Sequence, residues 1–425
     1  MTSGVFERHR FVTGFTIAAC IILVTDLGVG SLRYSRPPAP VPAGVPHEQS
    51  YRRANPRYHH DLIPLISEDS AQWGPIRYRV RTNSLGFKDA VARQVVADTA
   101  RPMVLLLGDS FTEGIGVEFE ATFAGRLASL GRQVKLDVLN GAVASYAPSI
   151  YWRKVVDLLD RRHVGFAEVV VFIDISDVPD ETEYFVDSDT NVQSHWPMSV
   201  AGPMVPAHPA AEGGWARTVT WLRRHSFALY SAAAIAKTSL GSGRLSATLP
   251  ASSGTAPHPC VIPVSHSDSY CRSAWAFDTA AMTSFGDAGL ANATRHMSAL
   301  AGDLRRRSIP LTIVVYPWRQ LIVERGRRSI ASSRWREWAA TERVNFLDLF
   351  PAFFALADAE GDAAATDSLG IRGDIHWNER GHAFVEKAFL TAYCSASAEP
   401  GFGVRPLARV CRTPPVRDAP RVPER

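Results

Sequence analysis

Two short segments, far apart in the chain, carry side chains that could perform nucleophilic catalysis. In the first, a leucine run at residues 105–107 leads into a Gly-Asp-Ser tripeptide that ends at Ser110. The second places Asp374 and His376 two positions apart. A serine hydroxyl becomes a nucleophile when an imidazole takes its proton and a carboxylate orients the imidazole. The two segments together predict a Ser110–His376–Asp374 triad, although each alone is also compatible with an ordinary turn or helix cap.

The residues around these segments predict the elements that must position them. A continuous apolar run at residues 103–107 indicates a buried strand. We interpret the largely apolar stretches at residues 134–139, 169–173 and 311–315 in the same way, with residues 346–349 as a weaker fifth strand. Helical periodicity lies between and after them at residues 123–130, 149–159, 294–307, 334–341 and 382–393. Strands that alternate with helices predict a mostly parallel five-stranded sheet in a three-layer α/β/α sandwich. Ligands of such sheets bind at the carboxyl ends of the strands, and Ser110 follows the first strand directly.

These two motifs and the order of the predicted elements resemble the SGNH or GDSL-type hydrolases. In that family, Gly-Asp-Ser follows the first strand and an Asp/His pair precedes the last helix. The resemblance extends over residues 103–393, apart from one insertion. It implies a flavodoxin-like SGNH hydrolase fold, with Ser110 as the nucleophile and His376 as the base. Asp374 is the expected orienting carboxylate, and Asp367 is an alternative to it.

The resemblance also implies an oxyanion hole, from which this chain departs at two positions. The amide of Ser110 is one expected donor. The amide of Ser145 is another, at a position where the family usually has glycine. Ser176 stands where the family has an asparagine whose side chain is the third donor. Losing one such donor costs about 10²–10³ in turnover, so we expect the Ser176 hydroxyl to take over that part.

The resemblance predicts a serine esterase acting on acyl esters, without a cofactor or metal. The Asp-x-His-Trp-Asn spacing resembles the alginate O-acetylation proteins and related envelope acyltransferases, so transfer of an acyl group to an envelope polysaccharide is an alternative. A degenerate glycan-binding protein and a docking role for the insertion are further alternatives. Trp318 could line an acyl or sugar pocket or serve packing. The adjacent His59 and His60 are expected to point in different directions, which argues against a metal site.

The N-terminus predicts export. Residues 11–30 carry Asp26 as their only charge, and twenty residues of helix reach about 30 Å, enough to cross a membrane. We expect a single-pass anchor in the inner membrane with the catalytic domain facing the periplasm or exterior; a cleaved signal peptide is the alternative. Four of the five cysteines form two close pairs, Cys260 with Cys271 and Cys394 with Cys411, which in an exported domain favour disulfides over free thiols.

The remaining organisation follows from composition. Basic and acidic side chains number 46 and 42, a net charge of +4 without long runs of one sign, which gives no support for nucleic-acid binding. We expect a membrane segment, a Pro-rich linker, a packed lead-in, a hydrolase domain and a tail at residues 1–30, 31–50, 51–100, 101–395 and 396–425. The insertion at about residues 178–283 is predicted to hold one helix and a surface loop, at residues 215–240 and 241–259.

Overall fold

A computed structural model describes residues 51–96, 101–194, 260, 269–323, 329–399 and 401–412. All of them belong to one compact unit, formed by Pro46–Ala207 together with His258–Arg425. The predicted membrane segment, the Pro-rich linker and the predicted helix and loop at residues 215–259 lie outside the described residues. Within the described ranges, no helix combines the length and the hydrophobicity needed to span a bilayer.

The predicted five-stranded parallel sheet is confirmed. Its strands are β5 Met103–Leu107, β6 Asp137–Asn140, β7 Glu168–Ile173, β10 Leu311–Val315 and β11 Asn345–Asp348. They lie side by side in the order β11-β10-β7-β5-β6, and every pair is parallel. In chain order this is the 2-1-3-4-5 arrangement of flavodoxin-like sheets, whose direction of winding reverses between β5 and β7. That reversal opens a crevice beyond the carboxyl end of β5.

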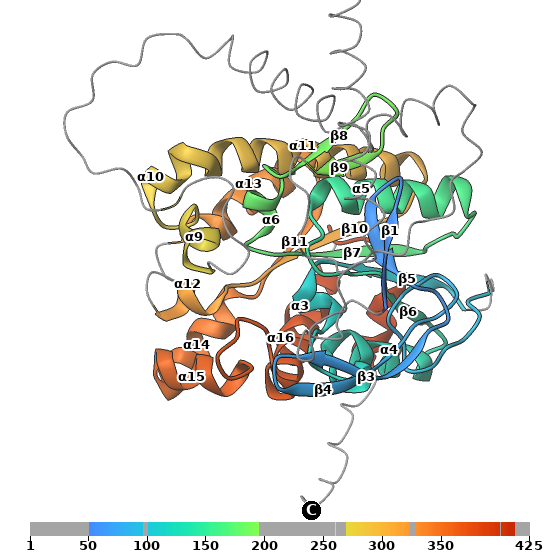
Figure 1. Ribbon diagram of the computed structural model, residues 1–425, viewed down its shortest axis with the longest axis horizontal. Helices are drawn as coiled ribbons and strands as arrows, with labels where there is room; N and C mark the ends of the chain where they lie inside the picture. The colour runs from blue at the N-terminus through green and yellow to red at the C-terminus, as the bar shows by residue number, and fades with distance from the viewer. Residues whose placement is uncertain are drawn as a thin grey trace, which may run out of the picture. The chain divides into compact units, whose positions relative to one another are not determined.

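Helices cover both faces of the sheet, so the three-layer arrangement is also confirmed (Figure 1). One face carries α5 Pro148–Val156, α11 Asp287–Arg306 and α13 Ala331–Glu342, and the other carries α4 Phe123–Gln133 and α16 Glu379–Ser397. The five helices predicted between and after the strands are present, but α11 begins seven residues earlier than expected. Beside the sheet lie three helices that the sequence did not predict, α12 Arg319–Val323, α14 Phe350–Glu360 and α15 Asp362–Leu369.

Strand β6 begins three residues later than predicted. Apolar Val134 had suggested a strand start, but it caps α4, and Lys135 adopts a left-handed φ of 56° that turns the chain toward the sheet. The weaker fifth strand is shifted by a single residue toward the N-terminus. Apolar stretches locate these strands because the strands are buried on both faces. Such stretches do not show at which residue the preceding turn ends.

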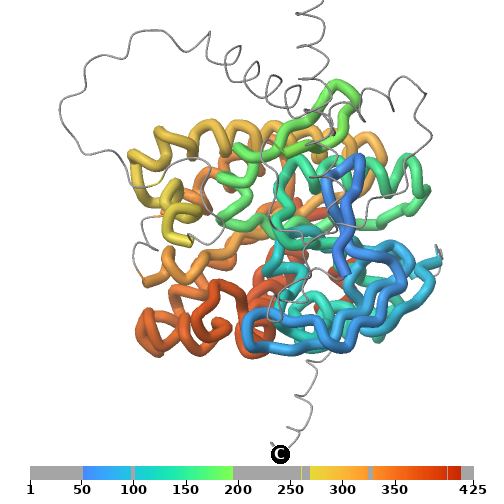
Figure 2. The backbone as a smooth tube through the Cα atoms, viewed as in Figure 1, coloured from blue at the N-terminus to red at the C-terminus, as the bar shows by residue number. Residues whose placement is uncertain are grey.

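The predicted lead-in folds as two hairpins packed against the domain. They are β1 Arg52–Asn55 with β2 His59–Leu62, and β3 Ser67–Trp73 with β4 Ile76–Arg81. Buried Tyr51, Tyr58 and Tyr78 anchor both hairpins in the common hydrophobic core. A bridge between Tyr58 and Val192 joins the first hairpin to the hairpin of β8 Tyr184–Val186 and β9 Val192–Ser194 (Figure 2). The lead-in is thus part of the fold that surrounds the predicted site.

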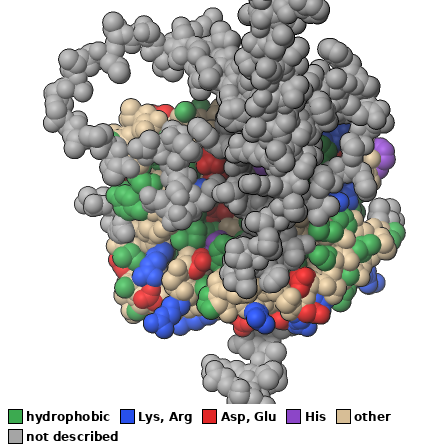
Figure 3. Space-filling view, viewed as in Figure 1, with side chains coloured by type: hydrophobic (Ala, Val, Ile, Leu, Met, Phe, Trp, Pro, Cys, Tyr) green, Lys and Arg blue, Asp and Glu red, His purple; other side chains and the backbone are tan. Residues whose placement is uncertain are grey.

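Both predicted disulfides are present. Cys260–Cys271 links two positions within the insertion, the second of them in helix α9 Ser269–Ala274, and Cys394–Cys411 ties α16 to the C-terminal segment. Helices α6 Asp177–Asp180 and α10 Thr279–Ala281 complete the described part of the insertion, which adds no strand to the main sheet. On the surface that Figure 3 displays, acidic and basic side chains are interspersed, as the sequence suggested.

Candidate active site

Ser110 lies at the carboxyl end of β5, at the reversal point of the sheet. Asp109 caps the short helix α3 Ser110–Glu113, with its side chain accepting from the Phe111 amide at 3.0 Å. The turn before it needs glycine, because a Cβ on Gly108 would lie 2.2 Å from Thr112 Oγ1. The local sequence therefore forces a tight strand-to-helix turn that presents the Ser110 hydroxyl at the crevice, at the N-terminal end of α3.

The structure brings together the three side chains predicted for the triad. His376 Nε2 lies 2.8 Å from Ser110 Oγ, and His376 Nδ1 lies 2.5 Å from Asp374 Oδ1. The His376 backbone amide donates to the same Asp374 oxygen at 2.9 Å. Asp374 and His376 belong to the loop before α16. Asn378 caps the N-terminus of this helix, with its side chain accepting from the Gly381 amide. This arrangement leaves a bare Nε2 to receive the Ser110 proton.

Trp73, in hairpin strand β3, is part of the site but was not predicted. Its indole Nε1 donates to Asp374 Oδ2 at 2.7 Å, and its ring lies edge-on to His376 with centroids 5.2 Å apart. Burial works to raise the pKa of Asp374, but the hydrogen bonds from His376 and Trp73 and the charge of His376 outweigh it and hold that pKa at about 2. Asp374 is therefore ionised at neutral pH.

Ser145 and His376 line the same cavity. Ser145 adopts a left-handed φ of 61°, a conformation that costs an L-residue roughly 1–2 kcal/mol and that glycine adopts freely. This explains why glycine suits the position in the family that the sequence resembles. Contacts hold the loop on several sides: Glu113 Oε2 accepts from the Ala144 amide at 2.7 Å, and the Tyr184 hydroxyl donates to Ser145 O at 2.8 Å.

The hydroxyl expected from Ser176 is engaged elsewhere. Ser176 Oγ donates to Asp174 Oδ1 at 2.6 Å, and the Ser176 amide donates to the same oxygen at 2.7 Å. The other oxygen, Asp174 Oδ2, accepts from Tyr316 Oη and Trp318 Nε1, both at 2.8 Å. Trp318, 2 % exposed, therefore packs and also contributes to the cavity wall. The Ser176 hydroxyl can serve an oxyanion only after it leaves Asp174, so its donor role stays a prediction.

Asp109 is a second acceptor near the nucleophile. Its Oδ2 lies 3.2 Å from Ser110 Oγ and competes with His376 for the single hydroxyl proton. Burial raises the pKa of Asp109 well above its usual range, and the charge of Asp174 raises it further. A protonated carboxyl is a weaker acceptor than a carboxylate, so the raised pKa favours the bond from Ser110 to His376.

The triad opens into a cavity of about 680 Å³, within the usual size range of small-molecule sites. Its lining includes Ser110, Ser145 and Ser176, together with Arg272 and Gln320. Arg272 is buried and pairs with Asp180 at 2.8 Å. Its place in the wall could not be anticipated, because helix α9 follows residues that carry no strand or motif signal.

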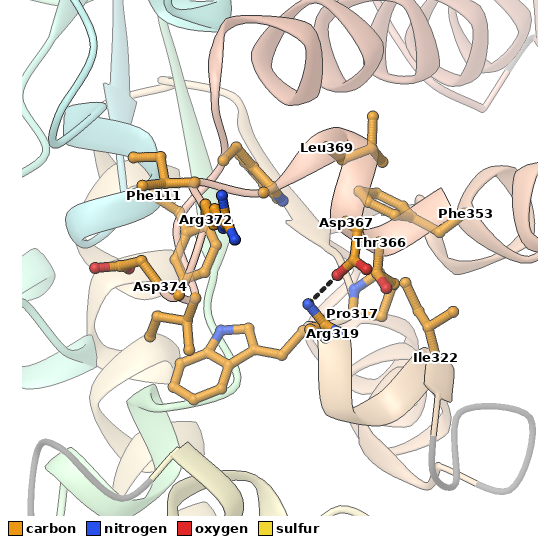
Figure 4. Close-up of a pocket in the computed structure, with 16 residues that line it drawn as sticks. Phe111, Pro317, Arg319, Ile322, Phe353, Thr366, Asp367, Leu369, Arg372 and Asp374 are labelled. Atoms are coloured by element: carbon orange, nitrogen blue, oxygen red, sulfur yellow. Dashed lines mark hydrogen bonds and ion pairs between the residues drawn. The ribbon is translucent and has the colours of Figure 1, made fainter. Parts of the chain in front are cut away.

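A second pocket of about 330 Å³ lies behind the Asp374 loop, with mainly apolar walls. Figure 4 shows Arg372 and Asp374 on one side of it and Ile322 and Phe353 on the other. Asp367 is exposed and forms an ion pair with Arg319 at this pocket. The alternative assignment of Asp367 as the orienting carboxylate is therefore wrong, because Asp374 occupies that place.

The expectation that the side chains of His59 and His60 point in different directions is also wrong. A left-handed φ of 73° at His59 turns the backbone so that the two rings meet, with the Nδ1 atoms 2.8 Å apart. His60 Nε2 then contacts Ala144 O at 2.7 Å. Within the described ranges, no group of three or more His, Cys, Asp or Glu side chains is arranged to hold a metal ion.

A hydroxyl, an imidazole and a carboxylate aligned at the reversal point of a parallel sheet define the geometry of a serine-hydrolase site. The sheet order and the Gly-Asp-Ser turn are also those of the SGNH hydrolases that the sequence resembles.

Comparisons with known proteins find similarity among solved structures alone. No family model and no curated protein matches the chain. Among solved structures, an acetyl xylan esterase is 13% identical, with 68% of this chain and 98% of that chain covered and a TM-score of 0.36. The esterase EstA from Pseudoalteromonas sp. is 8% identical, with 70% of this chain and 99% of that chain covered and a TM-score of 0.35. LAE5, an alpha/beta hydrolase from a Lake Arreo metagenome, is 11% identical, with 69% of this chain and 96% of that chain covered and a TM-score of 0.34. Such low values transfer no activity, so the chemistry must be argued from the side chains.

Proposed function

We propose that this protein is a serine ester hydrolase that cleaves acyl esters through Ser110, His376 and Asp374. The observation that carries the proposal is the continuous hydrogen-bonded line from Ser110 Oγ through the His376 ring to Asp374, with contacts of 2.8 and 2.5 Å. Distances of this size permit proton transfer without rearrangement of the loops. Three groups from two segments 266 residues apart meet in this line.

The mechanism follows from the positions of these atoms. His376 Nε2 takes the Ser110 proton as Ser110 Oγ attacks the acyl carbonyl carbon, and Asp374 stabilises the imidazolium. The amides of Ser110 and Ser145 face the oxygen that becomes negative. His376 then gives its proton to the leaving alcohol, whose bond to the acyl carbon breaks. A water molecule, deprotonated by His376, attacks the acyl-enzyme and releases the acid and the free Ser110 hydroxyl.

Hydrolysis of p-nitrophenyl acetate tests the proposal. The wild-type protein should release p-nitrophenol with saturation kinetics, and Ser110→Ala should lower kcat by at least about 10³-fold while its thermal unfolding midpoint stays within a few degrees. A Ser308→Ala variant, altered outside the site, serves as the matched control. Equal turnover by wild type and Ser110→Ala would refute the assignment, and no turnover by folded wild type would favour the glycan-binding alternative.

Acyl transfer to an envelope polysaccharide is the second candidate. The cavity of about 680 Å³ is larger than an acetyl group needs and leaves room for an acceptor hydroxyl in place of water. The Asp-x-His-Trp-Asn loop that resembles envelope acyltransferases supports the same idea. Adding an acetyl donor with an oligosaccharide acceptor distinguishes the two reactions: acetylated oligosaccharide indicates transfer, and free acetate alone indicates hydrolysis.

We also propose that the catalytic domain works outside the cytoplasm, held at the inner membrane by residues 11–30. The two disulfides support this location, because such bonds persist in oxidising compartments. Protease treatment of spheroplasts is the test: the domain should be degraded while a cytoplasmic marker survives. Protection of the domain until the cells are lysed would contradict the proposed location.

A further inference from the structure

The peptide that joins Ala144 to Ser145 has its orientation set by a residue outside the predicted triad. Its carbonyl oxygen, Ala144 O, lies 2.7 Å from His60 Nε2. In a planar trans peptide the N–H and C=O groups point in opposite directions. The contact with His60 therefore fixes the direction of the Ser145 N–H, which belongs to a residue lining the Ser110 cavity.

The two histidines form an ordered chain of donors. A carbonyl oxygen can only accept, so His60 Nε2 must carry the proton. In a neutral ring His60 Nδ1 is then bare, and it accepts from the Nδ1–H of His59 at 2.8 Å. A donor on the carbonyl also polarises the peptide and strengthens its N–H as a donor. The line runs from His59 through His60 to the Ser145 N–H.

The conformation of Ser145 explains why such a contact is needed. Its left-handed φ of 61° is unfavourable for a residue with a Cβ. Relaxing φ to a negative value rotates this same peptide and changes the direction of its N–H. Because that rotation also takes Ala144 O away from His60, the hydrogen bond opposes the relaxation. Glu113 and Tyr184 hold the neighbouring backbone groups, Ala144 N and Ser145 O, but neither contacts this peptide's carbonyl.

Burial keeps the chain of donors neutral. His60 is 6 % exposed, and its ring packs at 5.0 Å from the Tyr146 ring, whose hydroxyl donates to His60 O. Burial lowers the pKa of His59 to about 4 and lowers that of His60 well below its usual range. Both rings therefore keep the tautomers that the geometry requires at neutral pH.

We propose that His60 is a positioning residue that holds the Ser145 N–H toward the developing oxyanion, with His59 orienting the His60 ring. This inference rests on the proposed ester hydrolysis at Ser110. It makes the β1–β2 hairpin, which precedes the part of the chain that resembles SGNH hydrolases, a working component of the active site. His60 touches neither the substrate nor the reacting atoms and acts through one peptide bond.

Replacing His60 by glutamine, asparagine or leucine in the full-length protein tests the proposal. The glutamine amide nitrogen reaches the position of Nε2 and can donate to Ala144 O, whereas the asparagine nitrogen reaches only the position of Nδ1. We expect His60→Leu and His60→Asn to lower kcat on p-nitrophenyl acetate about 10–100-fold with KM within about twofold, a partial loss of one oxyanion donor. His60→Gln should recover most of that loss.

A double-variant comparison separates positioning from folding. If His60 opposes relaxation of φ at residue 145, the loss caused by His60→Leu should shrink at least about threefold in a Ser145→Gly background, since glycine tolerates the left-handed region. The rate at which a small fluorophosphonate labels Ser110 should fall in parallel with kcat, because its phosphoryl oxygen needs the same donors. Equal rates for the glutamine and asparagine variants, or a loss confined to KM, would overturn the proposal.

A crystal structure of the wild-type protein provides a second test of the role of His60. A crystal structure of phosphonylated wild-type protein should place the phosphoryl oxygen within about 3.2 Å of Ser145 N, with His60 still on Ala144 O. A phosphoryl oxygen turned away from Ser145 N overturns the role of His60 and leaves the esterase proposal intact. Wild-type protein that neither reacts with the phosphonate nor hydrolyses esters refutes the proposed function, and this inference with it.

Discussion

At the scale of single residues, hydrogen bonds from neighbouring side chains orient the side chains of the triad. Asp374 orients His376, and Trp73 in turn holds Asp374. The sequence predicted Ser110, His376 and Asp374 because each sits in a motif whose residue types serve one chemistry. It could not predict Trp73, which lies 301 positions from its partner in a hairpin without any motif. Nor could it show that the Ser176 hydroxyl donates to Asp174, since that depends on side-chain rotation.

Asp374→Asn tests the orienting carboxylate. We expect kcat to fall about 10³–10⁴-fold, because an amide can hold His376 in the wrong tautomer. Stability should respond to pH as well. The folded-state pKa of Asp374, about 2, lies below its ordinary value of 3.8, so the carboxylate stabilises the fold above pH 3.8 and loses that contribution as the pH falls toward 2.

Urea unfolding of wild type and Asp374→Asn at pH 7 and pH 2.5 provides the measurement. Wild type should exceed the variant by about 1–2 kcal/mol at neutral pH, after allowance for the partial exposure of Asp374. This difference should narrow at pH 2.5. A difference that widens in acid would show that Asp374 is not a stabilised carboxylate.

Trp73→Phe removes one hydrogen bond to Asp374 while keeping an aromatic ring beside His376. The pKa of Asp374 should rise, and kcat/KM should fall about tenfold, in line with the ~1.5 kcal/mol of a hydrogen bond to a charged group. Trp338→Phe is the matched control, because its indole donates to Ser298, away from the triad. Similar effects of the two substitutions on kcat/KM would argue against a specific role for Trp73.

At the scale of elements, buried ion pairs join the lead-in hairpin β1–β2 to helices of the hydrolase domain. Arg52 of β1 binds Glu113 of α3 through two contacts of 2.9 Å, and Lys154 of α5 binds Asp61 of β2 at 2.9 Å. The sequence predicted the five core strands because each lies in a short stretch dominated by apolar residues. It missed α14 and α15, where Pro351 interrupts the apolar pattern and small residues dominate after Gly361. Propensity says little about helices that depend on tertiary packing.

Lys154→Met tests the buried link between β2 and α5. The side chains of Lys154 and Asp61 are both fully buried, and removing one member of such a pair leaves an uncompensated charge that costs about 3–5 kcal/mol. Urea denaturation should show this loss. Adding Asp61→Asn should recover at least about 1 kcal/mol, because it removes the stranded charge. A double variant less stable than Lys154→Met alone would show that the carboxylate does not depend on Lys154.

At the scale of the whole molecule, disulfides fasten the peripheral segments to the sandwich. Cys394–Cys411 ties the end of α16 to the segment in which the Leu407 amide donates to Glu168 Oε2 at 3.1 Å, at the start of β7. The sequence predicted both bridges from the close spacing of the cysteines. The predicted limits of the linker, insertion and tail stay predictions, because composition marks such boundaries only coarsely.

Replacing Cys394 and Cys411 together by alanine should lower the free energy of unfolding by about 3 kcal/mol, since the bridge closes a loop of sequence separation 17. Thermal unfolding under oxidising conditions provides the measurement. The triad loop precedes the first turn of α16, whereas Cys394 lies near the last turn of this helix, so esterase activity at 25 °C should survive in the folded variant. An unchanged unfolding midpoint would indicate that the bridge does not form in solution.

The central claim is that Ser110 is an activated nucleophile, and intact-protein mass spectrometry after treatment with a fluorophosphonate tests it most directly. Wild type should gain the mass of one phosphonyl group, which peptide mapping should locate on Ser110. Ser110→Ala should gain none, and His376→Ala should react at least about 10³-fold more slowly. Folded wild-type protein that stays unlabelled, or a label that persists in Ser110→Ala, would contradict the account.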